Sequence, residues 1–95
     1  MLDGVRVVEL GVWVAGPAAG GVLADWGADV IKVEGPSGDP MRRMLQLTGG
    51  AREDIASPPF DLDNRGKRSI VLDLRTADGQ ANMHRLLATA DVFLT

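Results

Sequence analysis

The chain has 95 residues, of which 45% are hydrophobic and 24% are charged, a composition typical of a soluble globular protein and not of a disordered tail. Without cysteine and with one histidine, it has no disulfides or thiolate metal ligands, and a protein-only zinc site is not expected. The net charge of −3 argues against nucleic acid as a partner. No apolar run approaches the ~20 residues that span a bilayer and no leader pattern opens the chain, so we expect a cytoplasmic protein without a membrane partner.

The first part of the chain predicts a βαβ unit. A β-branched run from Val5 to Leu10, flanked by glycines, indicates a buried strand. Pro17 suits the first turn of a helix, which the apolar spacing extends to about Trp26. Asp29–Glu34 indicates a second strand, and parallel pairing with a right-handed crossover is expected.

The predicted helix contains a glycine pair, Gly20-Gly21. Each glycine disfavours a helix by about 1 kcal/mol relative to alanine. Close packing of the helix on the sheet, or close approach of a ligand, would explain this cost.

The second part of the chain begins with a long loop from Gly35 to Pro59, with a possible helical turn over residues 41–47. Lys67–Leu74 alternates as a third strand does. Thr76 is placed to cap a helix whose apolar stripe includes Met83, and Asp91–Thr95 begins a fourth strand. We expect a parallel α/β sheet.

Two predicted helices are few for four parallel strands, because such a sheet is normally covered on both faces. We therefore expect residues 1–95 to be the N-terminal part of a longer protein, cut where the next loop would begin. The alternative is that a second subunit of an obligate oligomer covers the exposed part of the sheet.

The glycine-bearing turn after the first strand fails both phosphate-binding fingerprints. Gly11 and Gly16 have P-loop spacing, but Pro17-Ala18 stands where Lys-Ser/Thr would be required. No G-x-G-x-x-G pattern follows the strand, which argues against a dinucleotide site. The turn still leads into a helix N-terminus, where open α/β sheets bind ligands. We therefore expect a binding site there, although these residues do not identify its ligand.

Other polar or aromatic residues have ordinary interpretations. The basic segment from Arg65 to Arg68 is either a solvated strand entry or an anion cradle. Glu34 and Asp39 could be general bases, but surface charge is the commoner role of such acids. We expect His84 to be exposed and Trp13 to lie in a core or an interface. Neither spacing nor composition identifies a reaction.

Taken in order, five segments resemble the N-terminus of the class III coenzyme A transferases (the CaiB/BaiF type), a family that includes formyl-CoA transferase, carnitine CoA-transferase and α-methylacyl-CoA racemase. The segments are LDGVRVVEL, AGP, LADWGADVIKVE, GDP with a nearby arginine, and NRGKRSIVLDL. The resemblance covers almost the whole chain. It implies a Rossmann-like domain, here the N-terminal part of the large domain of a two-domain enzyme that forms interlocked homodimers.

The resemblance also implies which residues contact coenzyme A. Val14 and Ala15 match the loop that lines the thioester end, where formyl-CoA transferases have glutamine at the position of Val14. The CoA-contacting strand segment falls on Leu72, Asp73, Leu74 and Arg75, with arginine in place of a common lysine. An arginine that contacts the adenine nucleotide often follows KVE, but this sequence has Gly35 there.

The chemistry that the resemblance implies is transfer of CoA from an acyl-CoA to a carboxylic acid through a downstream catalytic aspartate. No residue of this chain matches that aspartate, so we assign no catalytic residue, no metal and no permanently bound cofactor here; coenzyme A enters as substrate. Two alternatives stay open: an acyl-CoA racemase of the same family, and a non-catalytic nucleotide-binding or interaction module. We expect the 95-residue segment alone to be inactive.

Overall fold

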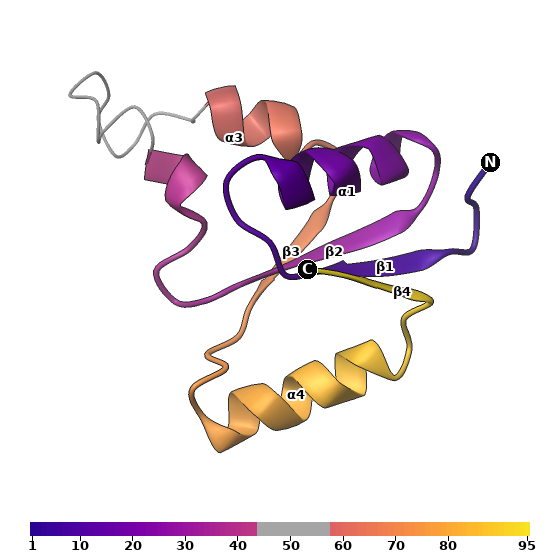
Figure 1. Cartoon of the computed structure of the whole chain (residues 1–95). Helices are drawn as coiled ribbons and strands as arrows, with labels where there is room; N and C mark the ends of the chain where they lie inside the picture. The colour runs from indigo at the N-terminus through magenta and orange to yellow at the C-terminus, as the bar shows by residue number, and fades with distance from the viewer. Residues whose placement is uncertain (44–57) are drawn as a thin grey trace.

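A parallel sheet runs through the centre of the molecule in the computed structural model, which describes residues 1–43 and 58–95 (Figure 1). Its order is β3-β2-β1-β4, with every neighbouring pair parallel. The strands are β1 (Arg6–Glu9), β2 (Asp29–Glu34), β3 (Arg68–Val71) and β4 (Val92–Leu94). The helices are α1 (Ala15–Asp25), α3 (Pro58–Asp63) and α4 (Ala77–Leu87), with a 3-10 turn, η1 (Pro40–Arg43).

Helices cover both faces of this sheet. Figure 1 shows α1 and α3 on one face and α4 on the other, and α1 packs against both β1 and β2. The face under α4 has an apolar core of Val8, Val33, Leu72 and Met83. The face under α1 has a smaller apolar cluster of Val7, Ala28 and Val30, with Leu23 of the helix packed against it. The α/β fold with a parallel sheet is therefore confirmed.

The predicted elements are found, with shifts at their ends. β2 has the predicted bounds, whereas the other strands are shorter and α1 begins at Ala15, two residues before the predicted start. Gly27 follows α1 with φ +99°, a backbone conformation that favours glycine and stops the helix. Thr76 caps α4 as predicted, since its Oγ1 accepts a hydrogen bond from the Gly79 N–H at 3.0 Å.

The predicted loop from Gly35 to Pro59 is wrong at its end, because α3 already begins at Pro58. A proline pair suits the first turn of a helix, where N–H groups have no intrahelical partner. The predicted helical turn begins as η1, and its remainder over residues 44–47 lies outside the described residues. Over residues 1–43 and 58–95, no helix is both long and apolar enough to cross a membrane.

The glycine pair in α1 lets the helix lie close to its neighbours. A Cβ atom on Gly20 would stand 2.0 Å from Oε1 of Glu9, and one on Gly21 would stand 2.7 Å from the carbonyl oxygen of Asp63 in α3. Both distances are shorter than any real contact, so any larger residue would push α1 away. Of the two explanations offered by the sequence, close helix packing is confirmed.

Candidate functional site

A pocket of about 310 Å³ opens at the carboxyl ends of β2 and β3. One wall is Gly35–Ser37, which follows β2, and the other is Leu72–Arg75, which follows β3. The carboxyl edge of a parallel sheet is the place where open α/β folds bind their ligands. All four residues of the predicted CoA-contacting strand segment (Leu72, Asp73, Leu74 and Arg75) therefore line one pocket.

An acid–base pair lies on the rim of this pocket. Nε of Arg75 is 2.9 Å from Oδ1 of Asp73, and the side chain of Arg75 is 83% exposed. The Arg75 hydrogen bonds lower the pKa of Asp73 and raise that of Arg75, so both groups are charged at neutral pH. A solvent-exposed pair of this kind is weak, so the guanidinium can exchange its partner for an anionic ligand.

The other two predicted residues lie apart from the pocket lining: Val14 ends the turn between β1 and α1, and Ala15 is the first residue of α1. Val14 is the N-cap of α1 and makes no side-chain cap hydrogen bond. Their turn belongs to the same carboxyl edge of the sheet as the pocket, because it follows β1. The structure thus places the six predicted residues along one edge, in two groups.

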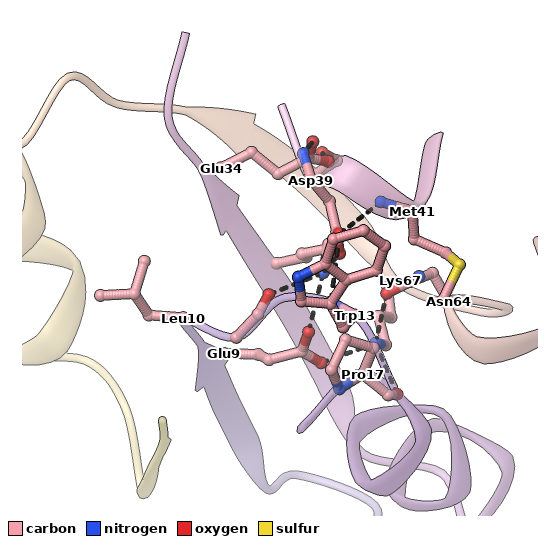
Figure 2. Close-up of polar contacts among 12 residues, drawn as sticks. Glu9, Leu10, Trp13, Pro17, Glu34, Asp39, Met41, Asn64 and Lys67 are labelled. Carbon is pink, nitrogen blue, oxygen red and sulfur yellow. Dashed lines mark hydrogen bonds and ion pairs between the residues drawn. The ribbon is translucent and has the colours of Figure 1, made fainter. Parts of the chain in front are cut away.

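Four charged residues form a buried charge cluster between the sheet and α1: Glu9, Lys32, Asp39 and Lys67. Figure 2 labels Glu9, Asp39 and Lys67 of this cluster. Glu9 and Lys32 are register partners on β1 and β2. Nζ of Lys32 lies 3.1 Å from Oε2 of Glu9, 2.8 Å from Oδ2 of Asp39 and 3.1 Å from the Gly11 carbonyl oxygen. Three oxygens therefore surround this ammonium: those of Glu9 and Gly11 accept hydrogen bonds from it, and Oδ2 of Asp39 forms an ion pair with it.

Lys67 completes the cluster from the segment before β3. Figure 2 shows its ammonium among Glu9, Pro17 and Asn64, at 2.6 Å from Oε1 of Glu9, 2.8 Å from the Pro17 carbonyl oxygen and 2.6 Å from Oδ1 of Asn64. Burial lowers the pKa of Lys67, and the bond to Glu9 offsets part of that effect. Two cations balance two anions, which is the condition for burying charges without a large net penalty.

Asp39 connects the cluster to the loops on either side of it. Its Oδ1 accepts hydrogen bonds from the backbone N–H of Trp13 at 3.2 Å and of Met41 at 2.9 Å, and its own N–H donates to Oε2 of Glu34 at 2.8 Å. Through its carboxylate and its backbone N–H, Asp39 thus holds the β1–α1 turn, η1 and the end of β2 together.

Glu34 extends the network toward α3. It takes hydrogen bonds from Nε and Nη2 of Arg42, the latter at 2.6 Å, and the Arg42 guanidinium lies 3.8 Å from the ring centroid of Phe60. Burial by itself would raise the pKa of Glu34, but the hydrogen bonds from Arg42 and the Asp39 N–H outweigh it, so the pKa is lowered.

These contacts correct two expectations. Glu34 and Asp39 are not surface charges, because they are only 6% and 1% exposed and each has named partners. The segment from Arg65 to Arg68 is not one anion cradle, since its three cations pair with three separate carboxylates. Arg65 and Arg68 do face solvent, as a strand entry would, whereas Lys67 is buried.

His84 is exposed, as expected, and Trp13 is 41% exposed instead of lying in a core. Within the described ranges, no group of three or more His, Asp or Glu side chains could hold a metal ion. Because the carboxylates of the buried charge cluster are neutralised by lysines, the cluster is suited to holding backbone segments in place and not to abstracting a proton from a ligand.

Sequence reasoning missed Glu9, Lys32 and Lys67. A signal was present, because Glu9, Lys32 and Glu34 occupy positions of strands that a doubly covered sheet buries. A charge on such a strand needs a buried partner of opposite sign. Lys67 was noted only as part of the basic segment from Arg65 to Arg68, and nothing local indicated its burial, since its partner Glu9 is far away in the sequence.

The comparisons with known proteins agree with this fold. The family model described as CoA-transferase family III matches residues 2–95. The chain is 43% identical over 95 residues to cinnamoyl-CoA:phenyllactate CoA-transferase of Clostridium sporogenes, covering 100% of the chain and 23% of the relative. It is 47% identical over 98 residues to succinate–glutarate CoA-transferase of Agrobacterium fabrum, covering 98% of the chain and 24% of the relative.

Solved structures show the same likeness. A crystal structure of a CAIB/BAIF family protein from Brucella suis has a TM-score of 0.85 and 45% identity, over 97% of this chain and 24% of that one. The chain therefore spans about a quarter of the length of the proteins that it matches, in their N-terminal part.

Proposed function

Because the chain belongs to CoA-transferase family III, we propose that it builds part of the coenzyme A site of an enzyme that moves CoA from an acyl-CoA to a carboxylic acid. The observation that carries this proposal is the pocket between Gly35–Ser37 and Leu72–Arg75. Its lining combines two leucines with an exposed guanidinium, which suits a nucleotide that carries phosphates.

In this proposal Arg75 pairs with a CoA phosphate, and Leu72, Asp73 and Leu74 contact the nucleotide. A guanidinium that is 83% exposed is accessible to a phosphate and can exchange its carboxylate partner for that anion. Val14 and Ala15 then line the thioester end of the same molecule. This assignment is supported by their place on the same edge of the sheet, after β1.

The acyl transfer itself would use a carboxylate outside these residues. In the proposed reaction, an aspartate carboxylate attacks the thioester carbonyl and expels the CoA thiolate, which leaves the acyl group on the aspartate as a mixed anhydride. The thiolate then attacks the aspartyl carbonyl, which releases the first acid as a carboxylate and gives an aspartyl-CoA thioester. The acceptor carboxylate attacks this thioester to form a second mixed anhydride, and the expelled thiolate attacks the acceptor's carbonyl, giving the new acyl-CoA and the free aspartate. The described residues contribute binding and positioning to this reaction. We further propose that the complete protein is a cytoplasmic homodimer and that residues 1–95 belong to its larger domain.

The acids remain open, because the relatives differ. The Clostridium sporogenes relative is named for cinnamoyl-CoA and phenyllactate, which are aromatic, and the Agrobacterium fabrum relative for succinate and glutarate, which carry two carboxylates. Family membership by itself therefore does not choose between apolar and dicarboxylic acyl groups.

The test is acyl exchange by the complete protein. Incubation with an acyl-CoA and a second carboxylic acid should yield a new thioester, detected by mass spectrometry. Exchange of the α-proton with solvent, without a new thioester, would support an acyl-CoA racemase instead. Calorimetry with CoA gives the second readout, and absence of binding by CoA and by acyl-CoA would contradict both enzymes and favour a non-catalytic module.

A further inference from the structure

The turn between β1 and α1 presents an apolar surface to solvent. Val12, Trp13 and Val14 are 54%, 41% and 53% exposed. From Gly11 to Gly20 there is no polar side chain in the sequence. Three consecutive exposed large apolar residues are unusual on a loop, and an apolar surface of this kind marks a binding site more often than an isolated exposed side chain does.

This turn lies where the chain changes direction across the sheet. From β1 the chain moves through α1 to β2 on one side, whereas β4 lies on the other side of β1, reached through α4. The crevice at the carboxyl ends of β1 and β4 is therefore the topological switch point, which is where ligands enter open α/β sheets. The exposed apolar turn and the pocket of Leu72–Arg75 thus share one edge.

The turn is also held in a defined conformation. Trp13 has φ +67°, in the left-handed region that a bulky residue adopts only when its surroundings enforce it. The enforcing contact is the hydrogen bond from the Trp13 N–H to Oδ1 of Asp39, a carboxylate that Lys32 fixes at 2.8 Å. Backbone strain of this kind is concentrated at functional sites, where it keeps a binding surface preorganised.

We propose that Val12, Trp13 and Val14 form the wall that receives the acyl group of the CoA thioester, and that this wall selects an apolar acyl group over one ending in a carboxylate. The inference rests on the proposed function for the presence of CoA. Its physical basis is that a terminal carboxylate placed against three apolar side chains loses water without gaining a hydrogen-bond donor. An apolar chain of the same length instead gains contact area with the indole.

The experiment compares two six-carbon acyl groups that differ at one end. Calorimetry on the complete protein would measure the Kd of hexanoyl-CoA, of adipoyl-CoA and of free CoA. Hexanoyl-CoA should bind more tightly than adipoyl-CoA by about tenfold or more. Equal affinities, or tighter binding of adipoyl-CoA, would overturn the acyl preference while CoA binding still supported the proposed function. Failure of all three to bind would overturn both.

Two variants assign the preference to the turn. Trp13→Gly removes the indole but suits φ +67°, so the backbone keeps its conformation without strain. Val14→Thr adds a hydroxyl with little change in volume. Each should reduce the ratio of the hexanoyl-CoA and adipoyl-CoA affinities several-fold.

The matched control is Val22→Thr, the same substitution at an exposed valine of α1 outside the turn. Val22→Thr should leave the ratio of the hexanoyl-CoA and adipoyl-CoA affinities unchanged. If the ratio did not change in Trp13→Gly and Val14→Thr, or changed equally in Val22→Thr, the turn would not be the acyl wall.

Discussion

The buried charge cluster and the pocket rim use the same kind of acid–base pair for different purposes. In the cluster, the side chains of Lys67 and Glu9 are 2% and 0% exposed, whereas at the rim Arg75 and Asp73 are 83% and 30% exposed. A buried pair cannot lose one member without leaving a charge uncompensated, but an exposed member can be replaced by water or by a ligand. We infer that the cluster fixes the loops and that the rim is free to bind.

Removing Lys32 should have the largest effect on stability. Lys32→Met would leave Glu9 and Asp39 buried without their shared cation, and we expect a loss of about 3–5 kcal/mol in the free energy of unfolding, measured by urea denaturation. The control is Arg68→Met, which breaks an exposed pair with Asp29 and should cost about 0–1 kcal/mol. A similar loss in the two variants would remove the distinction between buried and exposed pairs.

Glu34 should make the stability of the folded protein depend on pH. Its pKa in the folded protein is below the ordinary value of 4.5, so its charged contacts contribute fully above pH 4.5 and are lost as pH falls through the folded pKa. Glu34→Gln should lower stability at pH 7 by about 1.5–3 kcal/mol, because the charged hydrogen bonds from Arg42 are lost.

The measurement is urea denaturation of both proteins from pH 7 to pH 3. The difference in stability should shrink as pH falls, because protonated Glu34 resembles the amide. A difference that stayed constant with pH would show that the charge of Glu34 does not contribute.

Changes at the pocket rim should alter binding and not stability. Arg75→Ala should weaken CoA binding about tenfold, equivalent to one charged hydrogen bond of ~1.5 kcal/mol, and the loss should shrink at high salt. Asp73→Asn should instead strengthen CoA binding, because it removes the carboxylate that pairs with Arg75. Both are measured by calorimetry at two salt concentrations, with thermal unfolding as the control; an unchanged Kd in Arg75→Ala would refute the phosphate contact.

The smallest effect is expected at Gly35. A Cβ atom there would meet no other atom within 4 Å, so a side chain has room beside the pocket. Gly35→Arg should tighten CoA binding a few-fold, because the family resemblance implies an arginine at this position that contacts the nucleotide. Gly35→Gln, measured in parallel, separates charge from added contact area, and a weaker affinity in Gly35→Arg would place the nucleotide elsewhere.

The sequence predicted the sheet because strand patterns are local. β2 was predicted to the residue, since its run of β-branched residues and the nearby glycines, Gly27 and Gly35, lie within a few positions. The helix α3 was missed because its two prolines are more common in loops than in helices. The glycine pair of α1 signalled close packing, but only the structure shows that Glu9 and α3 are the neighbours.

The site was predictable only in part, for a physical reason. Leu72–Arg75 was predicted from the family resemblance as one continuous segment, and in the structure this segment lines one pocket. The bond between Trp13 and Asp39, in contrast, joins two loops that the fold brings together, and neither residue type indicates the other. Contacts between loops that are distant in the sequence leave no local sequence pattern from which they could be predicted.

The position of β3 has a consequence for how long the pocket persists. In the described part of the chain β3 is at the end of the sheet order and its four residues are exposed, whereas β2 is paired on both sides and almost fully buried. Edge strands open locally more often than central ones. We therefore expect amide hydrogen exchange to be faster in the β3 wall of the pocket than in the β2 wall.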